Sequence, residues 1–74
     1  MTPAEVAVLA ALHPDRTLTA IQIQRDSALT SWHTRNALAR LQARGLILPG
    51  HIRGRWRITA RGRIALGVKR RRFG

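Results

Sequence analysis

The apolar residues of this chain change their spacing at Gly45, and that change restricts the folds that the chain can adopt. Before Gly45 they recur every three or four residues, as in amphipathic helices. After it comes a short apolar run at 46–48, which Pro49 ends, and then a segment at 55–59 in which polar and apolar residues alternate. The sequence therefore predicts an α+β fold in which helices precede a β-hairpin.

The hairpin is predicted over residues 46–59, with its turn at the two glycines between the strands. Alternation in the second strand directs Trp56 and Ile58 toward the core, and Arg55 and Arg57 toward solvent. We therefore expect Trp56 to be a structural residue that holds the hairpin against the helices.

The first helix is predicted to begin at Pro3, where the missing N–H of proline costs nothing. Thr2 can cap it, and Glu5 is placed to complete a capping box. An apolar stripe over about three turns follows and stops at residues 13–15, which include a proline.

The second and third helices are predicted to form a helix-turn-helix. Thr19 can cap a helix of about two turns, and residues 28–29 then make a tight connection. The third helix follows over residues 30–44, and Gly45 suits the left-handed position just past its end.

A short last helix is expected over residues 60–66, with Gly67 separating it from a basic end. The predicted fold is thus a winged helix-turn-helix of three helices, a two-stranded wing and a short C-terminal helix. It forms one domain, residues 1–67, followed by a basic tail, residues 68–74.

Charge is distributed unevenly along the chain, which carries 14 lysines and arginines against three acids, for a net charge of +11. From Leu29 onward there are twelve basic side chains and no acidic one, so that segment is +12 and the rest is −1. Such uncompensated repulsion destabilises a small domain, and it suits a polyanionic partner. Nucleic acid is the first candidate.

Several other classes of protein are disfavoured. Cysteine is absent, and the three histidines lie far apart without acidic neighbours suited to ligation, so we expect no metal and no cofactor. The acids are scattered and no nucleophile constellation is visible, so we expect no enzyme. No apolar run reaches the length of a membrane span, and the first residues do not resemble a signal peptide, so we expect a cytoplasmic, nucleoid-associated protein.

The third helix is the predicted DNA-reading element. Its core face holds Thr34, Ala37, Leu38 and Leu41, and two small exposed alanines on the opposite face allow close approach to a surface. Asparagine can pair with adenine and arginine with guanine in the major groove, where the first turns of such a helix reach deepest. The predicted DNA-contacting residues of this helix are Ser31, Trp32, His33, Arg35, Asn36 and Arg40.

A second set of cations is expected to contact phosphates or the minor groove and to add affinity without sequence preference. It consists of Arg53, Arg55 and Arg57 in the wing and Lys69, Arg70, Arg71 and Arg72 in the tail.

Three segments in order resemble the winged helix-turn-helix domains of PadR-like and MarR-like transcriptional regulators. They are IQRDSAL at 23–29, LARLQARGLI at 38–47 and GRWRITARG at 54–62. In those families a helix ending LxRLxxxGLI is followed by an arginine-rich wing strand that leads into Y-x-L-T-x-x-G. Trp56 stands where the family usually has tyrosine, and Ala28 replaces the glycine that precedes the buried leucine.

The resemblance covers residues 4–66 and implies the fold and DNA binding. These regulators usually continue into long helices that dimerise and, in the MarR-like group, build a ligand pocket. Neither property is carried over, because the resemblance ends before such helices. We expect no small-molecule ligand and a monomer in solution, with cooperative binding possible on DNA.

Three functions remain open from the sequence. The first is a sequence-specific double-stranded DNA-binding protein, a small transcriptional regulator with helix 30–44 in the major groove and the 46–59 wing on the backbone or minor groove. The second is a nonspecific nucleic-acid-binding or architectural protein. The third is a winged-helix module that docks on an acidic protein partner.

Overall fold

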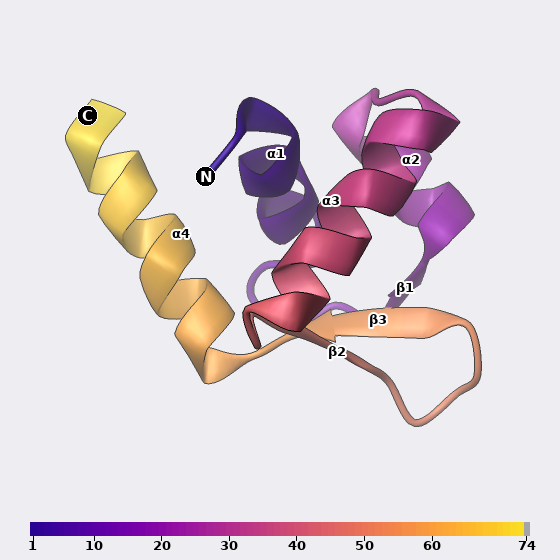
Figure 1. The fold of residues 1–74 in the computed structure, drawn as a ribbon. Coiled ribbons are helices and arrows are strands. Elements are labelled where there is room, and N and C mark those ends of the chain that lie inside the picture. The colour runs from indigo at the N-terminus through magenta and orange to yellow at the C-terminus, as the bar shows by residue number, and fades with distance from the viewer. Residues whose placement is uncertain (74) are drawn as a thin grey trace.

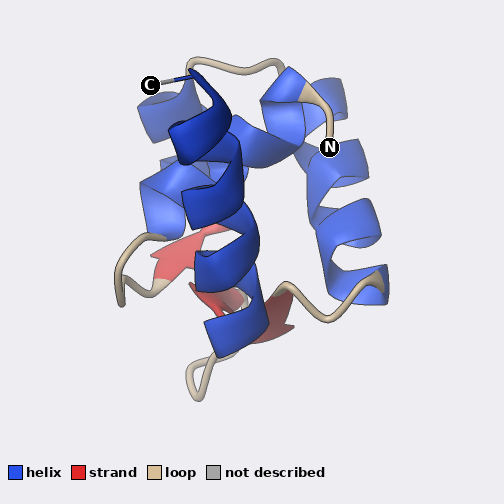
Figure 2. Ribbon diagram, turned by 90° about the vertical axis from the view of Figure 1, so that its left-hand side faces the viewer, coloured by secondary structure: helices blue, strands red, loops and turns tan. Residues whose placement is uncertain are grey.

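Four helices and a three-stranded antiparallel sheet form an α+β winged helix-turn-helix, as predicted (Figures 1 and 2). The computed structural model describes residues 1–73, and it describes the side chains of residues 1–69. The elements are α1 (Pro3–Leu12), β1 (Leu18–Thr19), α2 (Ala20–Ser27), α3 (Ser31–Ala43), β2 (Ile47–Pro49), β3 (Arg55–Ile58) and α4 (Ala60–Phe73).

The predicted two-stranded wing is the larger part of this sheet. Its order is β1-β3-β2, so the short strand before the helix-turn-helix pairs with the returning strand of the wing. Leu18 lies opposite Trp56, and Ile47 lies opposite Ile58. This third strand was not predicted, because nothing local shows which strand a two-residue segment will join.

The core lies where α1 meets the other three helices and the inner face of the sheet (Figure 1). Leu9 and Leu12 of α1, Ile23 of α2, Leu41 of α3 and Ile47 of β2 are fully buried. Leu29 and Trp56 are half-buried and pack against this cluster. As predicted, Trp56 is a structural residue that ties the wing to the helices.

The predicted stop of α3 is confirmed in detail. Gly45 has a φ of 74°, its N–H donates to the Gln42 carbonyl at 3.0 Å, and the Leu46 N–H donates to the Leu41 carbonyl at 3.0 Å. These two bonds make a Schellman motif, which satisfies carbonyls that the end of a helix leaves free. The same turn starts β2 in the direction needed to pair with β3.

Ala28 occupies the left-handed conformation between α2 and α3, with a φ of 54°. This conformation costs an L-residue about 1 to 2 kcal/mol relative to glycine. Glycine has an opposing effect, because its greater flexibility stabilises the unfolded chain by about 0.4 to 1 kcal/mol. Ala28→Gly is therefore expected to stabilise the protein by about 0.5 to 1 kcal/mol, as measured by urea unfolding. The same change in a regular turn of α3, Ala39→Gly, should instead destabilise it by about 1 kcal/mol.

The last helix is longer than predicted: α4 continues through Gly67 to Phe73, and the expected end at Leu66 is wrong. A glycine inside a helix costs only about 1 kcal/mol, and no proline follows to stop the helix. Residues 69–72, the basic run, therefore lie in the last turns of α4. The side chains of Arg70, Arg71 and Arg72, and all of Gly74, lie outside the described part of the chain.

A corner between β3 and α4 is built around Thr59. Its hydroxyl donates to the carbonyls of Gly45 and Leu46, at 2.8 and 3.0 Å, and accepts from the Gly62 N–H at 3.0 Å. Its backbone N–H also donates to the Leu46 carbonyl, at 3.1 Å. This arrangement fixes α4 against the loop that follows α3.

Candidate nucleic-acid interface

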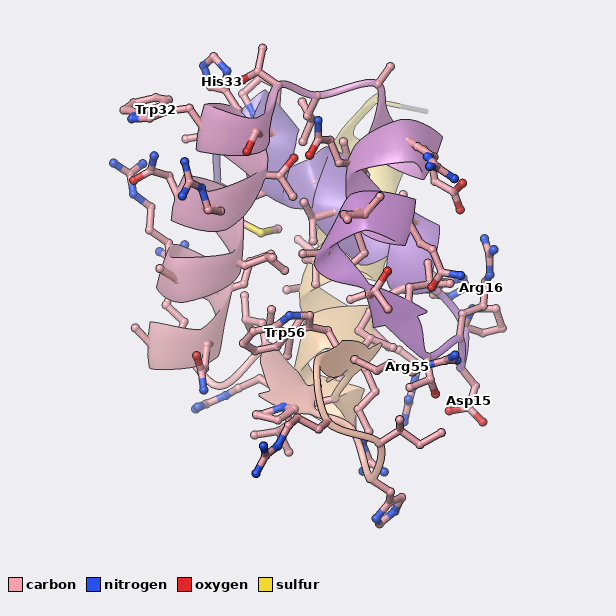
Figure 3. All side chains as sticks on the ribbon, turned by 90° about the vertical axis from the view of Figure 1, so that its right-hand side faces the viewer. Asp15, Arg16, Trp32, His33, Arg55 and Trp56 are labelled. Carbon is pink, nitrogen blue, oxygen red and sulfur yellow. The ribbon has the colours of Figure 1, made fainter. Side chains whose placement is uncertain are left out.

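The two predicted faces of α3 are present in the structure. Thr34, Ala37, Leu38 and Leu41 are buried, while Ser31, His33, Arg35 and Arg40 are exposed and Trp32 is 63% exposed. Figure 3 shows the Trp32 and His33 side chains projecting from the first turn of α3, away from the body of the protein. A helix that displays an indole, an imidazole and cations beside small alanines presents a surface suited to a major groove.

The His33 ring is held in a defined orientation by the residue that caps α3. Thr30 Oγ1 accepts from the His33 backbone N–H at 3.1 Å and lies 2.7 Å from His33 Nδ1. When the hydroxyl donates to Nδ1, the remaining ring proton is on Nε2, which then donates outward. The Trp32 ring packs edge-on against His33, with centroids 5.1 Å apart. The outward Nε2–H suits a guanine or phosphate acceptor.

Asn36 is half-buried one turn further along α3, and its amide is already engaged. Asn36 Nδ2 donates one of its two N–H groups to the Trp32 carbonyl at 2.8 Å, which leaves the second N–H and Oδ1 available. Bidentate pairing with adenine needs one N–H donor and the Oδ1 acceptor, so Asn36 has the groups for this pairing even while its other N–H is bonded to Trp32.

A hollow of about 500 Å³ lies between the start of α1 and the exposed face of α3. Pro3 and Ala4 form one wall, and Trp32, Asn36 and Arg40 form the other. The predicted site residues of α3 thus border a concave surface shared with α1.

Glu5 lies beneath this hollow and contacts α3. Its Oε1 is 4.0 Å from Arg40 Nη1, and its Oε2 accepts from Arg44 Nη1 at 3.4 Å. As predicted, Thr2 Oγ1 accepts from the Glu5 backbone N–H. The Glu5 carboxylate was expected to accept from the backbone N–H of Thr2, but it accepts from the Thr2 hydroxyl at 3.1 Å. From the sequence, only a capping role was predicted for Glu5. One feature of the sequence could have pointed to a distant partner: Glu5 is an acid at a helix start with no basic residue near it in sequence.

The wing arginines fall into two groups. Arg53 is exposed in the turn between β2 and β3. Arg55 and Arg57 lie on the outer face of the sheet: Arg55 extends to the side of Arg16 and Asp15, away from Trp32 (Figure 3). The structure therefore does not bring Arg55 or Arg57 together with the exposed face of α3.

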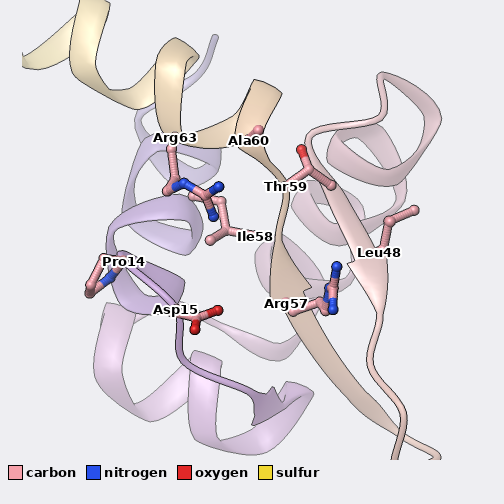
Figure 4. Close-up of a pocket in the computed structure, with 8 residues that line it drawn as sticks. All are labelled: Pro14, Asp15, Leu48, Arg57, Ile58, Thr59, Ala60 and Arg63. Atoms are coloured by element: carbon pink, nitrogen blue, oxygen red, sulfur yellow. The ribbon is translucent and has the colours of Figure 1, made fainter.

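The outer face of the sheet carries its own basic surface. Arg57 and Arg63 border a hollow of about 580 Å³ together with Asp15 and Leu48 (Figure 4). Arg16, which pairs with Asp26 at 3.2 Å, lies at the same side of the molecule (Figure 3). Sequence analysis did not include Arg16 or Arg63 among the candidate site residues.

Of the predicted tail cations, only Lys69 has a described side chain. It is half-buried and borders an apolar hollow of about 300 Å³ with Met1, Pro3 and Val6. None of the helices within residues 1–73 has the length and apolar content that crossing a membrane requires.

No family model matches the chain, and no curated protein matches its sequence. Among solved structures it is similar to BpsR of Bordetella bronchiseptica, with a TM-score of 0.82 and 26% identity over 92% of this chain and 52% of that one. The chain thus spans about half the length of BpsR, whose structure concerns the regulation of its DNA binding by 6-hydroxynicotinic acid. This winged helix-turn-helix fold therefore also occurs in a DNA-binding protein.

Proposed function

We propose that the protein is a sequence-specific double-stranded DNA-binding protein that acts as a small transcriptional regulator. The exposed face of α3 is the observation that carries the proposal. That face combines an outward imidazole, an amide and arginines at the start and middle of a helix whose other side is buried. Each of these groups can hydrogen-bond base edges in a major groove.

The proposed binding mode follows from the arrangement of the elements. Helix α3 enters the major groove with its first two turns nearest the bases, as recognition helices of this motif do. The small side chains of Ala39 and Ala43 allow close approach further along the same face. Arg53 at the tip of the wing reaches the adjacent backbone or minor groove. Arg55 and Arg57 face away from α3 and contribute less to this contact.

The similarity to BpsR supports DNA binding, because its structure concerns a protein whose DNA binding is regulated. Control by a small molecule is not part of the proposal, since this chain corresponds to about half of BpsR. A regulator of this kind acts at the nucleoid.

The basic outer face of the sheet favours a second candidate, a nonspecific nucleic-acid-binding protein. Arg57 and Arg63 lie around a single acid, Asp15, on a sheet face and not on a helix that fits a major groove. Contacts of this kind neutralise phosphates without regard to sequence.

Selection from random DNA duplexes tests the proposed function. A regulator should enrich a defined motif of a few base pairs, and the enriched duplex should bind at least about a thousandfold more tightly than its scrambled version. Equal, salt-sensitive binding to every duplex would support the nonspecific candidate instead. Failure to bind any duplex would favour the module for an acidic protein partner.

Asn36→Ala tests the base-reading role of α3. We expect it to weaken binding to the selected duplex by about 1 to 3 kcal/mol and to relax the preference at one base pair. Gln42→Ala removes an amide from the last turn of α3 and should leave the base preference unchanged. Equal weakening of Asn36→Ala on all duplexes would show that this face touches only backbone.

A further inference from the structure

Glu5 is an acidic residue in an unusual position, at the border of a strongly basic surface. It is 3% exposed, and its carboxylate accepts from the Thr2 hydroxyl and from Arg44. Removing a charge from water is costly unless good partners replace the water. The buried carboxylate is therefore held in place, and it in turn restrains the groups that contact it.

Of the two arginines around Glu5, Arg40 belongs to the face proposed to bind DNA, and Arg44 follows it at the C-terminal end of α3. Arg40 and Arg44 are one turn apart on α3, with side chains 65% and 58% exposed. Each guanidinium offers five N–H donors in a planar fork, and contact with one carboxylate occupies only one edge of it. Arg40 Nη1 lies 4.0 Å from Glu5 Oε1, and Arg40 also borders the hollow with Trp32 and Asn36.

We propose that Glu5 is a specificity-determining residue of the DNA-binding face, a proposal that rests on the proposed function. Its carboxylate orients Arg40 and Arg44, and its negative charge offsets part of theirs. The first effect reduces the side-chain entropy that Arg40 loses when it pairs with a base edge or an ordered phosphate. The second weakens attraction to the backbone of every duplex.

Both effects act in the same direction on sequence preference. Specificity is the difference between the affinities for the cognate and the competing duplex, and it rises when the competing affinity falls. A carboxylate next to two arginines lowers backbone attraction on all sequences. This loss of affinity is offset only on a duplex that offers the oriented Arg40 a complementary base edge or phosphate.

Glu5→Gln is the test, because glutamine keeps the size of the side chain and its acceptor for Thr2. Binding to the selected duplex and to its scrambled version is measured across a salt range. One additional free cation should raise affinity for the scrambled duplex about five- to tenfold near 0.15 M salt and steepen the salt slope by about one. The preference for the selected duplex should fall about three- to tenfold, because Arg40 is no longer oriented.

Asp26→Asn is the matched control. It also removes one carboxylate that pairs with an arginine, Arg16, but that pair lies away from α3. Charges separated by more than about 8 Å are largely screened at this salt, so scrambled-duplex affinity should change less than about twofold and the preference should not change. Equal effects of Glu5→Gln and Asp26→Asn would mean that only net charge matters, and would overturn the proposal.

Arg40→Lys gives a second test that does not alter the buried carboxylate. It keeps the charge but replaces the planar fork by a point charge. The preference should fall as it does in Glu5→Gln, whereas the salt slope should stay that of the wild type. An unchanged preference in Arg40→Lys would overturn the proposal, even if Glu5→Gln proves too unstable to study. A wild-type protein without any sequence preference would instead remove the proposed function, and the inference with it.

Discussion

Gly62→Ala is expected to destabilise the protein by about 3 kcal/mol or more, which is a large part of the total stability of so small a domain. A Cβ atom at Gly62 would overlap the carbonyl oxygen of Leu46 and would lie 2.8 Å from Cγ1 of Ile58. The first of these atoms belongs to the backbone, so no side-chain rotation relieves the overlap. Helix α4 would have to move away from the loop that follows α3, and the bonds of Thr59 would be strained.

Thermal unfolding measures this effect. A loss of about 3 kcal/mol corresponds to a fall in Tm of about 12 to 24 °C for a domain of this size. Gly67→Ala is the matched control, because outside its own turn of helix no described atom lies within 4 Å of the added Cβ. The same helix should gain about 0.5 to 1 kcal/mol from the better helix former. A Gly62→Ala protein with the same Tm as the wild type would show that α4 does not pack closely on the Leu46 carbonyl.

The sequence predicted those parts of the fold that depend on neighbouring residues. Gly45 marked the end of α3, and alternation assigned Trp56 and Ile58 to the inner face of the sheet. The motif that ends at Gly62 was noticed only as part of a family resemblance. Its physical reason, contact between α4 and the Leu46 carbonyl, became visible when segments distant in sequence were placed side by side.

Two of the features that were missed depend on long-range contacts, and the third depends on local helix propensity. Strand β1 exists because Leu18 meets Trp56, and no local pattern specifies that pair. Glu5 contacts Arg44 across 39 positions, so sequence analysis considered only its capping role. Gly67 suggested a helix end, but a single glycine does not overcome the helical preference of the residues around it.

The same distinction applies to the candidate site. The helical period predicted which residues of α3 are exposed, because one helix fixes its own faces. Alternation also placed Arg55 and Arg57 on the outer side of their strand, but it did not show that this side faces away from α3. The direction in which this side of the strand faces depends on how the sheet packs against the helices. That packing joins segments that are distant in sequence, so no local pattern shows it.

Salt dependence is expected to be the largest effect on DNA affinity. If about six phosphates are neutralised, log K should fall against log salt with a slope near −5, so that affinity drops about a thousandfold between 50 and 200 mM salt. The slope counts the cations that displace counterions, and it is measured by titration on the selected and scrambled duplexes. A slope near zero would exclude a phosphate-dominated interface and would leave the charge of +11 without this explanation.

Single substitutions assign this slope to parts of the molecule. Arg53→Gln, at the tip of the wing, should flatten it by about one unit, whereas the matched change Arg57→Gln should leave it nearly unchanged, because Arg57 faces away from α3. Glutamine at all four positions 69–72 keeps a good helix former in α4 and should flatten the slope by about one to three units without altering base preference. An effect of Arg57→Gln equal to that of Arg53→Gln would place the outer face of the sheet on DNA. In that case the basic surface around Asp15, and not the tip of the wing, would bind the DNA backbone next to the groove that α3 occupies.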